Sequence, residues 1–460
     1  MSLLADSRLD DILRAHNPWW ATGALPRSAR YTQPRGADAF LAATGRPALL
    51  AGPRRCGKTA TLFRRIDGHL RAEGRPREVA YLPLDHPLLR LVPPAQLVDR
   101  VVKAMEPKGR PLVLLDGVQA LPQWPERFLE IVTTRPHPLF VGAASVAPGL
   151  ADPAFDVVPV TPLSFREFCA LKGVPDLGAP PLDPFAPVLP ERADPAEDVL
   201  FHRVLDPLLA DYLVRGGLFE TALAPDPAAA HEFVRREVVA RAVYQDLPAV
   251  VGVDKVAELE RVLLAALLQG GGPVVLEAFA DALEIDAGTV GRYLEHLGRA
   301  FLLTELRNFA AAATDRSRPR VHAADPSLPN ALFERGAAVL ARPDERRGLL
   351  AGAVVAHLQQ VARERGFDLA YFREGDLEAE VVLVGPDGAI PVLLVDREEA
   401  GEEEAALAEK VLRRTQARTA FVLSRAGPRM RAPLTFFETV VHLPASYFLY
   451  ALAGGGSLSS

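Results

Sequence analysis

Cysteine is scarce in this sequence, and no long apolar run is present. Only Cys56 and Cys169 occur among 460 residues, too few for a disulfide framework or a four-thiolate zinc site. The stretch from Met1 to Asp11 alternates apolar and charged residues and lacks the apolar run of a signal peptide. No apolar run approaches the ~20 residues needed to cross a bilayer. We therefore expect a soluble, cytoplasmic protein with no membrane partner, since free thiols are usual in the cytosol.

An excess of charge of one sign is also missing. Lys and Arg number 52 and Asp and Glu number 58, which gives a formal net charge of −6. These numbers exclude a surface that is basic throughout, although they allow a local basic patch. Apolar residues make up 49% of the chain, which is enough for a buried core, and the length suggests about three domains.

Gly and Pro signals divide the chain into stretches of different character. The predicted divisions are an N-terminal segment (1–34), a core with alternating strand and helix patterns (35–173), a Pro/Ala-rich linker (174–197), a helical region (198–335), a C-terminal domain (336–453) and a flexible tail (454–460). In the core, helical patterns alternate with short apolar runs at Pro47–Ala51, Val79–Leu84, Pro111–Leu115, Leu139–Val141 and Val157–Val160. Strands that alternate with helices predict an α/β fold with a mainly parallel sheet.

One motif is specific enough to predict a ligand. The residues Gly52, Pro53, Arg54, Arg55, Cys56, Gly57, Lys58 and Thr59 match the phosphate-binding loop G-x-x-x-x-G-K-[ST] in full. An apolar run precedes the loop and a helical segment follows it, as the chemistry requires. The glycines let backbone N–H groups point at phosphate oxygens, and the helix N-terminus adds partial positive charge. We expect Lys58 to bind the β- and γ-phosphates of ATP and Thr59 to coordinate Mg²⁺.

A second half of the nucleotide site follows about sixty residues later. Asp116 ends the apolar run Leu112–Leu115 and is expected to hold Mg²⁺. The next residue, where ATPases of this kind usually carry Glu, is Gly117, which cannot act as a base. Hydrolysis is therefore expected to be weak, or to use Asp85 or Gln119, and Gly117→Glu is expected to raise it. Ser145 lies where a γ-phosphate sensor would fall, and a loop serine is the equal alternative.

With these motifs in place, the chain resembles bacterial and archaeal AAA-type P-loop ATPases whose C-terminal half is a domain of unknown function. The resemblance covers most of the chain. It is carried by Asn17–Trp20, Gly52–Thr59, Asp116–Gln119, Trp124, Pro162–Phe168 and Tyr212–Gly217. It implies a P-loop parallel sheet, then a helical and winged-helix region, then a restriction-endonuclease-like α/β domain. The biological role of the family does not follow from the resemblance.

Two of these segments also have a reading of their own. Ser164 and Glu167 have the spacing of a helix capping box, which favours a structural role for Pro162–Phe168. Arg215 could reach the γ-phosphate of a neighbouring subunit, but a surface charge is the stronger interpretation.

The helical region holds a pattern typical of a DNA reader. Ala278–Leu283 and Thr289–Leu297 predict helix, turn, helix, and Phe301–Leu306 with Val321–Ala323 predict a two-stranded wing. Candidate phosphate contacts are Arg292, Arg316, Arg318 and Arg320. A winged helix also docks proteins, so a protein partner stays open beside DNA.

The nuclease-like domain lacks most of the residues that its chemistry requires. Such nucleases hold a divalent metal with an acidic residue on one strand and E-x-K on the next. Glu380 falls near the first position, but Leu394 and Asp396 stand at the other two, and Ala351 stands where a helix glutamate is expected. We therefore expect no nuclease activity. The acidic run from Glu398 to Glu404 is interpreted as a solvated face.

These observations together predict an ATP- and Mg²⁺-binding protein that acts as a nucleotide-dependent switch with weak or altered hydrolysis. Two alternatives remain: a DNA-binding regulator that uses the winged helix, and a protein-docking scaffold with a vestigial nucleotide site.

Overall fold

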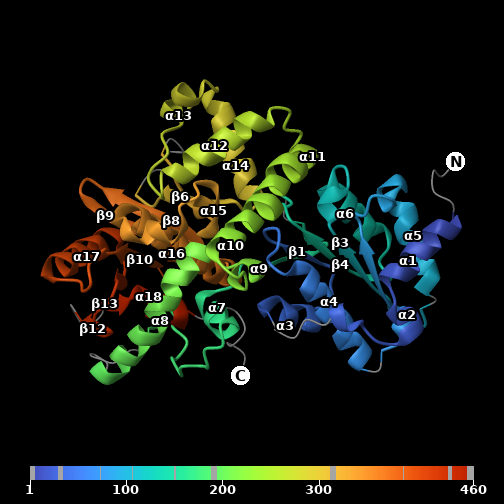
Figure 1. Ribbon diagram of the computed structural model, residues 1–460, viewed down its shortest axis with the longest axis horizontal. Helices are drawn as coiled ribbons and strands as arrows, with labels where there is room; N and C mark the ends of the chain where they lie inside the picture. Colours follow the sequence, from blue (N-terminus) through green and yellow to red (C-terminus); the bar gives the residue numbers. More distant parts are fainter. Residues whose placement is uncertain are drawn as a thin grey trace. The chain divides into compact units, whose positions relative to one another are not determined.

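The computed structural model describes residues 6–29, 35–72, 74–105, 107–149, 152–187, 194–310, 318–386, 388–433 and 438–452 (Figure 1). Their contacts divide into two compact units. The first contains residues 1–161, 240–256 and 299–301, and the second contains residues 162–239, 257–298 and 302–460. The predicted tail 454–460 and Arg316 lie outside the described residues. The predicted six-part division stays a prediction.

The first unit is built on a parallel five-stranded sheet of order β2-β3-β4-β1-β5. Its strands are β1 (Ala48–Ala51), β2 (Val79–Pro83), β3 (Leu112–Asp116), β4 (Leu139–Ala144) and β5 (Asp156–Pro159). Its helices are α1 (Asp6–His16), α2 (Trp19–Thr22), η1 (Arg27–Ala29), α3 (Gly36–Ala43), α4 (Lys58–Arg71), η2 (Pro76–Glu78), η3 (Leu89–Leu91), α5 (Pro94–Met105), η4 (Val118–Ala120), α6 (Trp124–Thr134), η6 (Ala242–Asp246) and α11 (Leu247–Val251). The parallel α/β sheet expected from the five apolar runs is confirmed.

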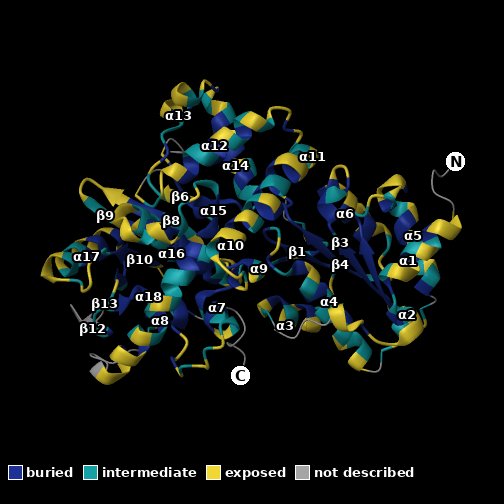
Figure 2. Ribbon diagram, in the orientation of Figure 1, coloured by how far each residue is buried: buried dark blue, intermediate teal, exposed yellow. Residues whose placement is uncertain are grey.

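Alternation along the strands creates a core on each face of this sheet. On β1, Leu49 packs with α1, α5 and α6, whereas Ala48 and Leu50 pack with α3 and α4. Because both faces are covered, β1 and β2 are buried along their whole length and β3 and β4 along most of theirs, and they appear mainly dark blue in Figure 2, whereas the edge strand β5 is partly exposed. All strands of a parallel sheet end at the same edge, so this packing brings the loops after β1, β2, β3 and β4 together.

The aromatic segment near the N-terminus covers the outer edge of β2. Asn17 donates to the carbonyl of Tyr81 (2.9 Å) and accepts from its N–H (2.6 Å), as a neighbouring strand would. The indole N–H groups of Trp19 and Trp20 both donate to the carbonyl of Val79, at 3.0 and 2.9 Å. These bonds satisfy an edge strand that would otherwise expose its backbone, and they fix the position of Tyr81.

The second unit contains a mixed eight-stranded sheet of order β12-β13-β11-β10-β9-β8-β6-β7. Its strands are β6 (Leu303–Asn308), β7 (Arg320–Ala323), β8 (Asp368–Glu374), β9 (Leu377–Gly385), β10 (Gly388–Leu394), β11 (Thr419–Ser424), β12 (Met430–Pro433) and β13 (Thr439–Pro444). Its longer helices are α7 (Phe165–Leu171), α8 (Pro195–Arg215), α10 (Pro227–Phe233), α12 (Val256–Leu268), α13 (Leu276–Leu283), α14 (Ala287–Arg299), α16 (Pro343–Arg365), α17 (Glu402–Thr415) and α18 (Ala445–Ala451). The shorter ones are α9 (Phe219–Ala222), η5 (Val234–Val239), α15 (Ser327–Leu332) and η7 (Gly336–Ala341). One core contains α7, α8, α16 and α18, and a separate core contains α17.

The expected wing is present as a hairpin but belongs to this sheet. β6 pairs with β7 in antiparallel fashion and with β8 in parallel fashion, through Arg307–Ala370 and Asn308–Tyr371. The predicted helices are observed as α13 and α14. The hairpin therefore extends the C-terminal sheet, an arrangement that local sequence patterns could not reveal.

The two family segments around Ser164 and Gly217 contact each other. Ser164 caps α7 by the predicted capping box: its hydroxyl accepts from the Glu167 N–H (3.3 Å), and its own N–H donates to the Glu167 carboxylate (2.8 Å). The Tyr212 hydroxyl donates to the carbonyl of Leu163 (3.0 Å), and the Leu163 N–H donates to the carbonyl of Gly217 (2.6 Å). These bonds support the structural interpretation of both segments.

Candidate functional site: a P-loop with an aspartate at the next strand end

The phosphate loop connects β1 to α4 and depends on its two glycines. A Cβ at residue 52 would lie 1.9 Å from the carbonyl oxygen of Val160, so no side chain fits there. Gly57 precedes α4 in the left-handed region, with φ +98°. The turn between them directs the first N–H groups of α4 toward the carboxyl edge of the sheet, where helix N-termini bind anions.

The side chain of Lys58 lies inside the loop. It is 7% exposed, and its ammonium donates to the carbonyls of Gly52 (2.9 Å) and Pro53 (2.6 Å). The thiol of Cys56 is buried 3.8 Å from the same nitrogen. Lys58 therefore places a positive charge within the curve of the loop, where phosphate oxygens would bind.

Asp116 meets Thr59 as the sequence predicts. The Thr59 hydroxyl donates to Asp116 Oδ2 at 2.7 Å, and the Tyr81 hydroxyl donates to the same oxygen at 2.8 Å. Burial raises the pKa of Asp116, and these two hydrogen bonds partly offset that rise. A hydroxyl and a carboxylate in contact are suitable ligands for Mg²⁺ and its water shell. Tyr81 was missed at the sequence level; the only clue was a hydroxyl-bearing residue within an otherwise apolar strand.

Gly117 follows Asp116 in the left-handed region, with φ +71°. A Cβ at this position would lie 3.2 Å from both Cβ and Cγ of Asp85, the exposed residue that follows Leu84 beyond β2. The Asp85 side chain thus occupies space next to residue 117, where the usual glutamate would begin. The expectation that Gly117→Glu simply restores a base needs correction, because the backbone conformation and the contact with Asp85 both strain that substitution.

Gln119 and Ser145 form a buried pair at the end of β4. The Ser145 N–H donates to Gln119 Oε1 at 3.2 Å, and the two side chains are 7% and 5% exposed. Ser145 follows Ala144, the register partner of Ala51 on β1. It therefore lies beside the loop, while Gln119 is engaged in holding the backbone of Ser145.

Two residues from distant parts of the chain also reach these loops within the first unit. Arg54 binds Asp246 through two hydrogen bonds of 2.6 Å, and the side chains are 18% and 7% exposed. Arg299 donates to the carbonyls of Ala147 and Pro148, which follow Ser145. Asp246 ends the π-helix η6, a rare helix type that is frequent at functional sites. Neither contact was predicted, because 192 and about 150 residues separate the partners.

Residues 44–169 match the family model of the AAA domain. This stretch is a AAA domain. Residues 206–338 match a domain of unknown function (DUF8612). The chain thus contains a AAA domain of the P-loop type, followed by a region that matches DUF8612. A search of curated protein sequences found no match.

Three solved structures show remote similarity. PCH-2 from C. elegans matches with a TM-score of 0.26 and 13% identity, over 49% of this chain and 65% of that one. A signal transduction ATPase with numerous domains (STAND) and a tetratricopeptide repeat sensor, from Pyrococcus horikoshii, matches with a TM-score of 0.25 and 10% identity, over 74% of this chain and 50% of that one. Protein VC1899 from Vibrio cholerae matches with a TM-score of 0.18 and 11% identity, over 88% of this chain and 96% of that one. The chain spans less than two thirds of the length of the first two.

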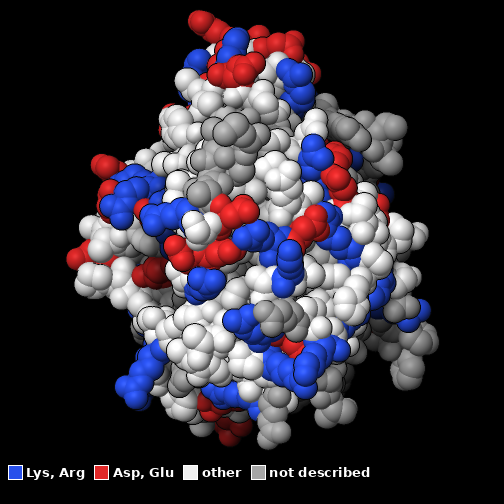
Figure 3. Space-filling view, turned by 90° about the vertical axis from the view of Figure 1, so that its right-hand side faces the viewer, with Lys and Arg blue, Asp and Glu red and all other residues white. Residues whose placement is uncertain are grey.

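The candidate DNA contacts in the described part of the chain differ in exposure. Arg292 is exposed on α14 and donates to the Thr289 hydroxyl, and Arg318 is exposed before β7. Arg320 is 5% exposed, pairs with Glu378 at 2.7 Å and stacks on Tyr371. Its guanidinium is therefore not available to a phosphate, which corrects the interpretation of this residue. On the face shown in Figure 3, both basic and acidic groups lie among uncharged residues.

The carboxylates that the nuclease resemblance singles out each bind an arginine of α16. Glu380 on β9 is buried, pairs with Arg347 and accepts from the Leu394 N–H at 2.8 Å; burial raises its pKa. Asp396 accepts from Arg346 at 2.7 and 2.8 Å. In the described residues, no group of three or more His, Cys, Asp or Glu could hold a metal ion.

The guanidinium of Arg215 is bound by two neighbouring groups. Arg215 donates to Asp211 (2.5 Å) and to the carbonyl of Ala224 (2.7 Å), which supports its structural interpretation.

Among the helices of the described residues, none has both the length and the apolar character needed to span a membrane.

Proposed function

We propose that this chain binds ATP with Mg²⁺ and uses the nucleotide as a conformational switch with slow hydrolysis. The observation that carries the proposal is the meeting of Lys58, Thr59 and Asp116 at one edge of the AAA-domain sheet. Lys58 and the loop N–H groups would bind the phosphates, and Thr59 with Asp116 would hold the metal and its waters. Mg²⁺ supplies charge neutralisation on the phosphate oxygens when it is bound.

Asp85 is the group best placed to orient the attacking water in the absence of a glutamate at position 117. It is exposed, lies beside Gly117 and is close enough to Asp116 for the two charges to interact. Asp85→Asn should lower kcat for ATP hydrolysis about 100-fold and leave nucleotide affinity unchanged. Asp99→Asn is the matched control, because Asp99 is a carboxylate of the same unit that pairs with Arg135. An unchanged rate in Asp85→Asn would assign the water to another group.

The switch is supported by the two contacts that bring distant segments to the phosphate loops. Arg54 lies within the P-loop, and its partner Asp246 ends a π-helix that continues into α11. A loop that closes on a triphosphate must carry Arg54 with it, so the ion pair would report the nucleotide state to residues 242–251. Arg299 provides a second link, to the segment after Ser145.

Amide hydrogen exchange tests this switch. Exchange in residues 242–251 should differ between ATP- and ADP-bound protein, and the difference should disappear in Asp246→Asn. Asp67→Asn is the matched control, because it removes an aspartate that pairs with Arg71 on the exposed face of α4. Equal exchange in both nucleotide states would exclude the switch, while ATP binding itself could persist.

DNA binding has less support than the nucleotide switch. Of the four candidate arginines, Arg292 and Arg318 are exposed, Arg320 is engaged with Glu378, and Arg316 is not described. Electrophoretic mobility shifts at low salt test this candidate: Arg292→Ala with Arg318→Ala should weaken binding and flatten its salt dependence. Absence of any shift for the unaltered protein would eliminate it.

A further inference from the structure

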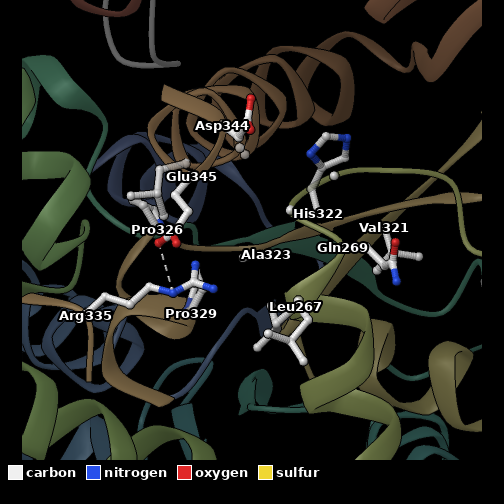
Figure 4. A pocket seen from close by; sticks show the side chains of 16 residues that line it. Leu267, Gln269, Val321, His322, Ala323, Pro326, Pro329, Arg335, Asp344 and Glu345 are labelled. Carbon is white, nitrogen blue, oxygen red and sulfur yellow. Dashed lines mark ion pairs between the residues drawn. The ribbon is translucent and has the colours of Figure 1, made fainter. Parts of the chain in front are cut away.

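The second unit contains a small cavity that is separate from the residues of the nucleotide site. Its volume is about 170 Å³, and its walls come from the end of α12, from β7, from Arg335 and from the first turns of α16 (Figure 4). This volume is below the roughly 300–1,000 Å³ of sites for drug-sized ligands, so it suits a molecule of one small ring. Most of the wall is glycine or apolar side chain, and the apolar side chains include Leu267, Val321, Ala323, Pro326, Pro329 and Leu349.

The guanidinium of Arg335 is held in this wall by two neighbouring side chains. Arg335 lies between α15 and η7, and its Cζ lies 4.7 Å from the centre of the Phe333 ring. Its Nε lies 3.2 Å from Oε2 of Glu345, an ion pair that the dashed line in Figure 4 marks. The Arg335 side chain is 18% exposed, so it is largely covered and yet can be reached from the cavity that it lines.

The two terminal nitrogens of this guanidinium are unused donors. Glu345 pairs with Nε alone, and within the described chain neither Nη1 nor Nη2 of Arg335 has a hydrogen-bond or ion-pair partner. Neither nitrogen is enclosed by the protein, so both are accessible to a ligand. In Figure 4 they extend past the ion pair in the direction of Leu267. Two N–H groups on one planar fork match the two oxygens of a carboxylate.

Glu345 does not neutralise Arg335 by itself, because a second arginine shares its carboxylate. Nη1 of Arg342 donates to Oε1 of Glu345 at 2.9 Å, so two guanidinium groups face one carboxylate. Asp344 is exposed, and in Figure 4 its carboxylate is turned away from Arg335. The side chain of Arg342 does not cap α16, so the first turn of this helix adds partial positive charge. The charges beside Arg335 therefore favour an anion of a single charge over a cation.

We infer that this cavity binds a small monocarboxylate whose apolar body is about the size of one ring. Arg335 would bind the two carboxylate oxygens through its terminal nitrogens, and the apolar and glycine wall would cover the body. The inference does not depend on the proposed nucleotide switch, because every residue that carries it belongs to the second unit.

Ligand-observed NMR and calorimetry with benzoate test the inference on the full chain, with and without saturating ADP. We expect benzoate to bind equally in both conditions, and its uncharged analogue benzamide to bind at least 10-fold more weakly. Arg335→Met should weaken benzoate at least 10-fold, and Arg335→Lys, which keeps the charge without the fork, should recover only part of that loss. Arg342→Met is the matched control, because Arg342 also pairs with Glu345 but does not line the cavity, and it should change the affinity less than three-fold.

A second variant tests the cavity without changing a charge.

Gly352→Ala narrows the cavity, and the nearest neighbour of the new Cβ would be the Ala323 carbonyl oxygen at an ordinary 3.5 Å, so the fold should be retained. This variant should weaken benzoate at least three-fold. The inference is overturned if benzoate does not bind, if benzamide binds as well as benzoate, or if Arg335→Met binds benzoate as the unaltered chain does. Should Arg335→Met fail to fold, an unchanged affinity in Gly352→Ala overturns the inference.

Discussion

Asp116 and Glu380 are two carboxylates on two sheets, and what faces each of them decides what it can do. Burial raises the pKa of both. Asp116 accepts from the hydroxyls of Thr59 and Tyr81, which are neutral and can rotate toward a metal-bound water. Glu380 pairs with the guanidinium of Arg347, which occupies the carboxylate with a fixed positive charge. An acidic residue at the expected place is therefore a metal ligand only where its neighbours leave room for a cation.

The largest effect should come from removing the first carboxylate. Asp116→Asn should lower Mg²⁺-dependent ATP hydrolysis by 100-fold or more, because the metal loses its anionic anchor. Asp396→Asn, two residues beyond β10 in the second unit, is the matched control and should leave the steady-state rate within two-fold. An equal loss of ATPase rate in Asp116→Asn and Asp396→Asn would contradict the assignment of Asp116 as the metal-binding carboxylate.

The second carboxylate should matter for stability instead. Arg347→Leu leaves Glu380 buried without its cation, a change that costs about 3–5 kcal/mol for a fully buried pair. Because the Arg347 side chain is 47% exposed, we expect about 2 kcal/mol, measured by urea unfolding. Arg347→Leu combined with Glu380→Gln should recover most of this loss, and a double variant as unstable as the single one would contradict the assignment.

The loss of unfolding free energy in Arg347→Leu should also depend on pH. Burial raises the folded-state pKa of Glu380, so between the unfolded and folded values the folded state binds more protons. The free energy of unfolding then falls as pH rises between these two pKa values. Arg347 lowers the pKa of Glu380, so its removal raises the folded-state pKa further and extends the pH range of this fall. The free-energy difference between Arg347→Leu and the unaltered chain should be larger at pH 8 than at pH 5. A difference that grows on acidification would show that Glu380 is ionised without help from Arg347.

The smallest effect concerns the hydroxyl that holds Asp116. Tyr81→Phe removes one hydrogen bond that lowers the pKa of Asp116, so Mg²⁺ should bind about 10-fold more weakly while kcat at saturating metal changes little. Tyr371→Phe removes a hydroxyl that donates to the carbonyl of Arg318 in the other unit and serves as the control. Metal titration of the ATPase rate provides the measurement, and equal metal affinity would exclude a role for Tyr81.

Local sequence patterns were sufficient to predict much of the AAA-domain fold. The phosphate loop, the strand that ends in Asp116 and the capping box at Ser164 depend on residues near in sequence, and the structure places them as expected. Asp85 and Gln119 were both candidates for the group that orients the attacking water, and the position of Asp85 beside Gly117 is the basis on which we propose Asp85.

Long-range placement could not be predicted in the same way. The pairing of β6 with β8 is set by backbone hydrogen bonds across 63 residues, and it made the predicted wing part of a larger sheet. Asp246 contacts the P-loop residue Arg54, and Arg299 contacts the segment after Ser145. Both contacts depend on how the chain folds back between distant residues, and no sequence motif marks that path. Tyr81 acts through its position on a strand edge that Asn17 covers.

Calorimetric titration of the full chain with ATP and Mg²⁺ tests the central claim most directly. We predict micromolar affinity for the unaltered protein and a loss of at least 100-fold in Lys58→Met, which keeps the length of the side chain and removes its charge. Unchanged affinity in Lys58→Met, or no heat of binding for the unaltered protein, would contradict the assignment of Gly52–Thr59 as a nucleotide site.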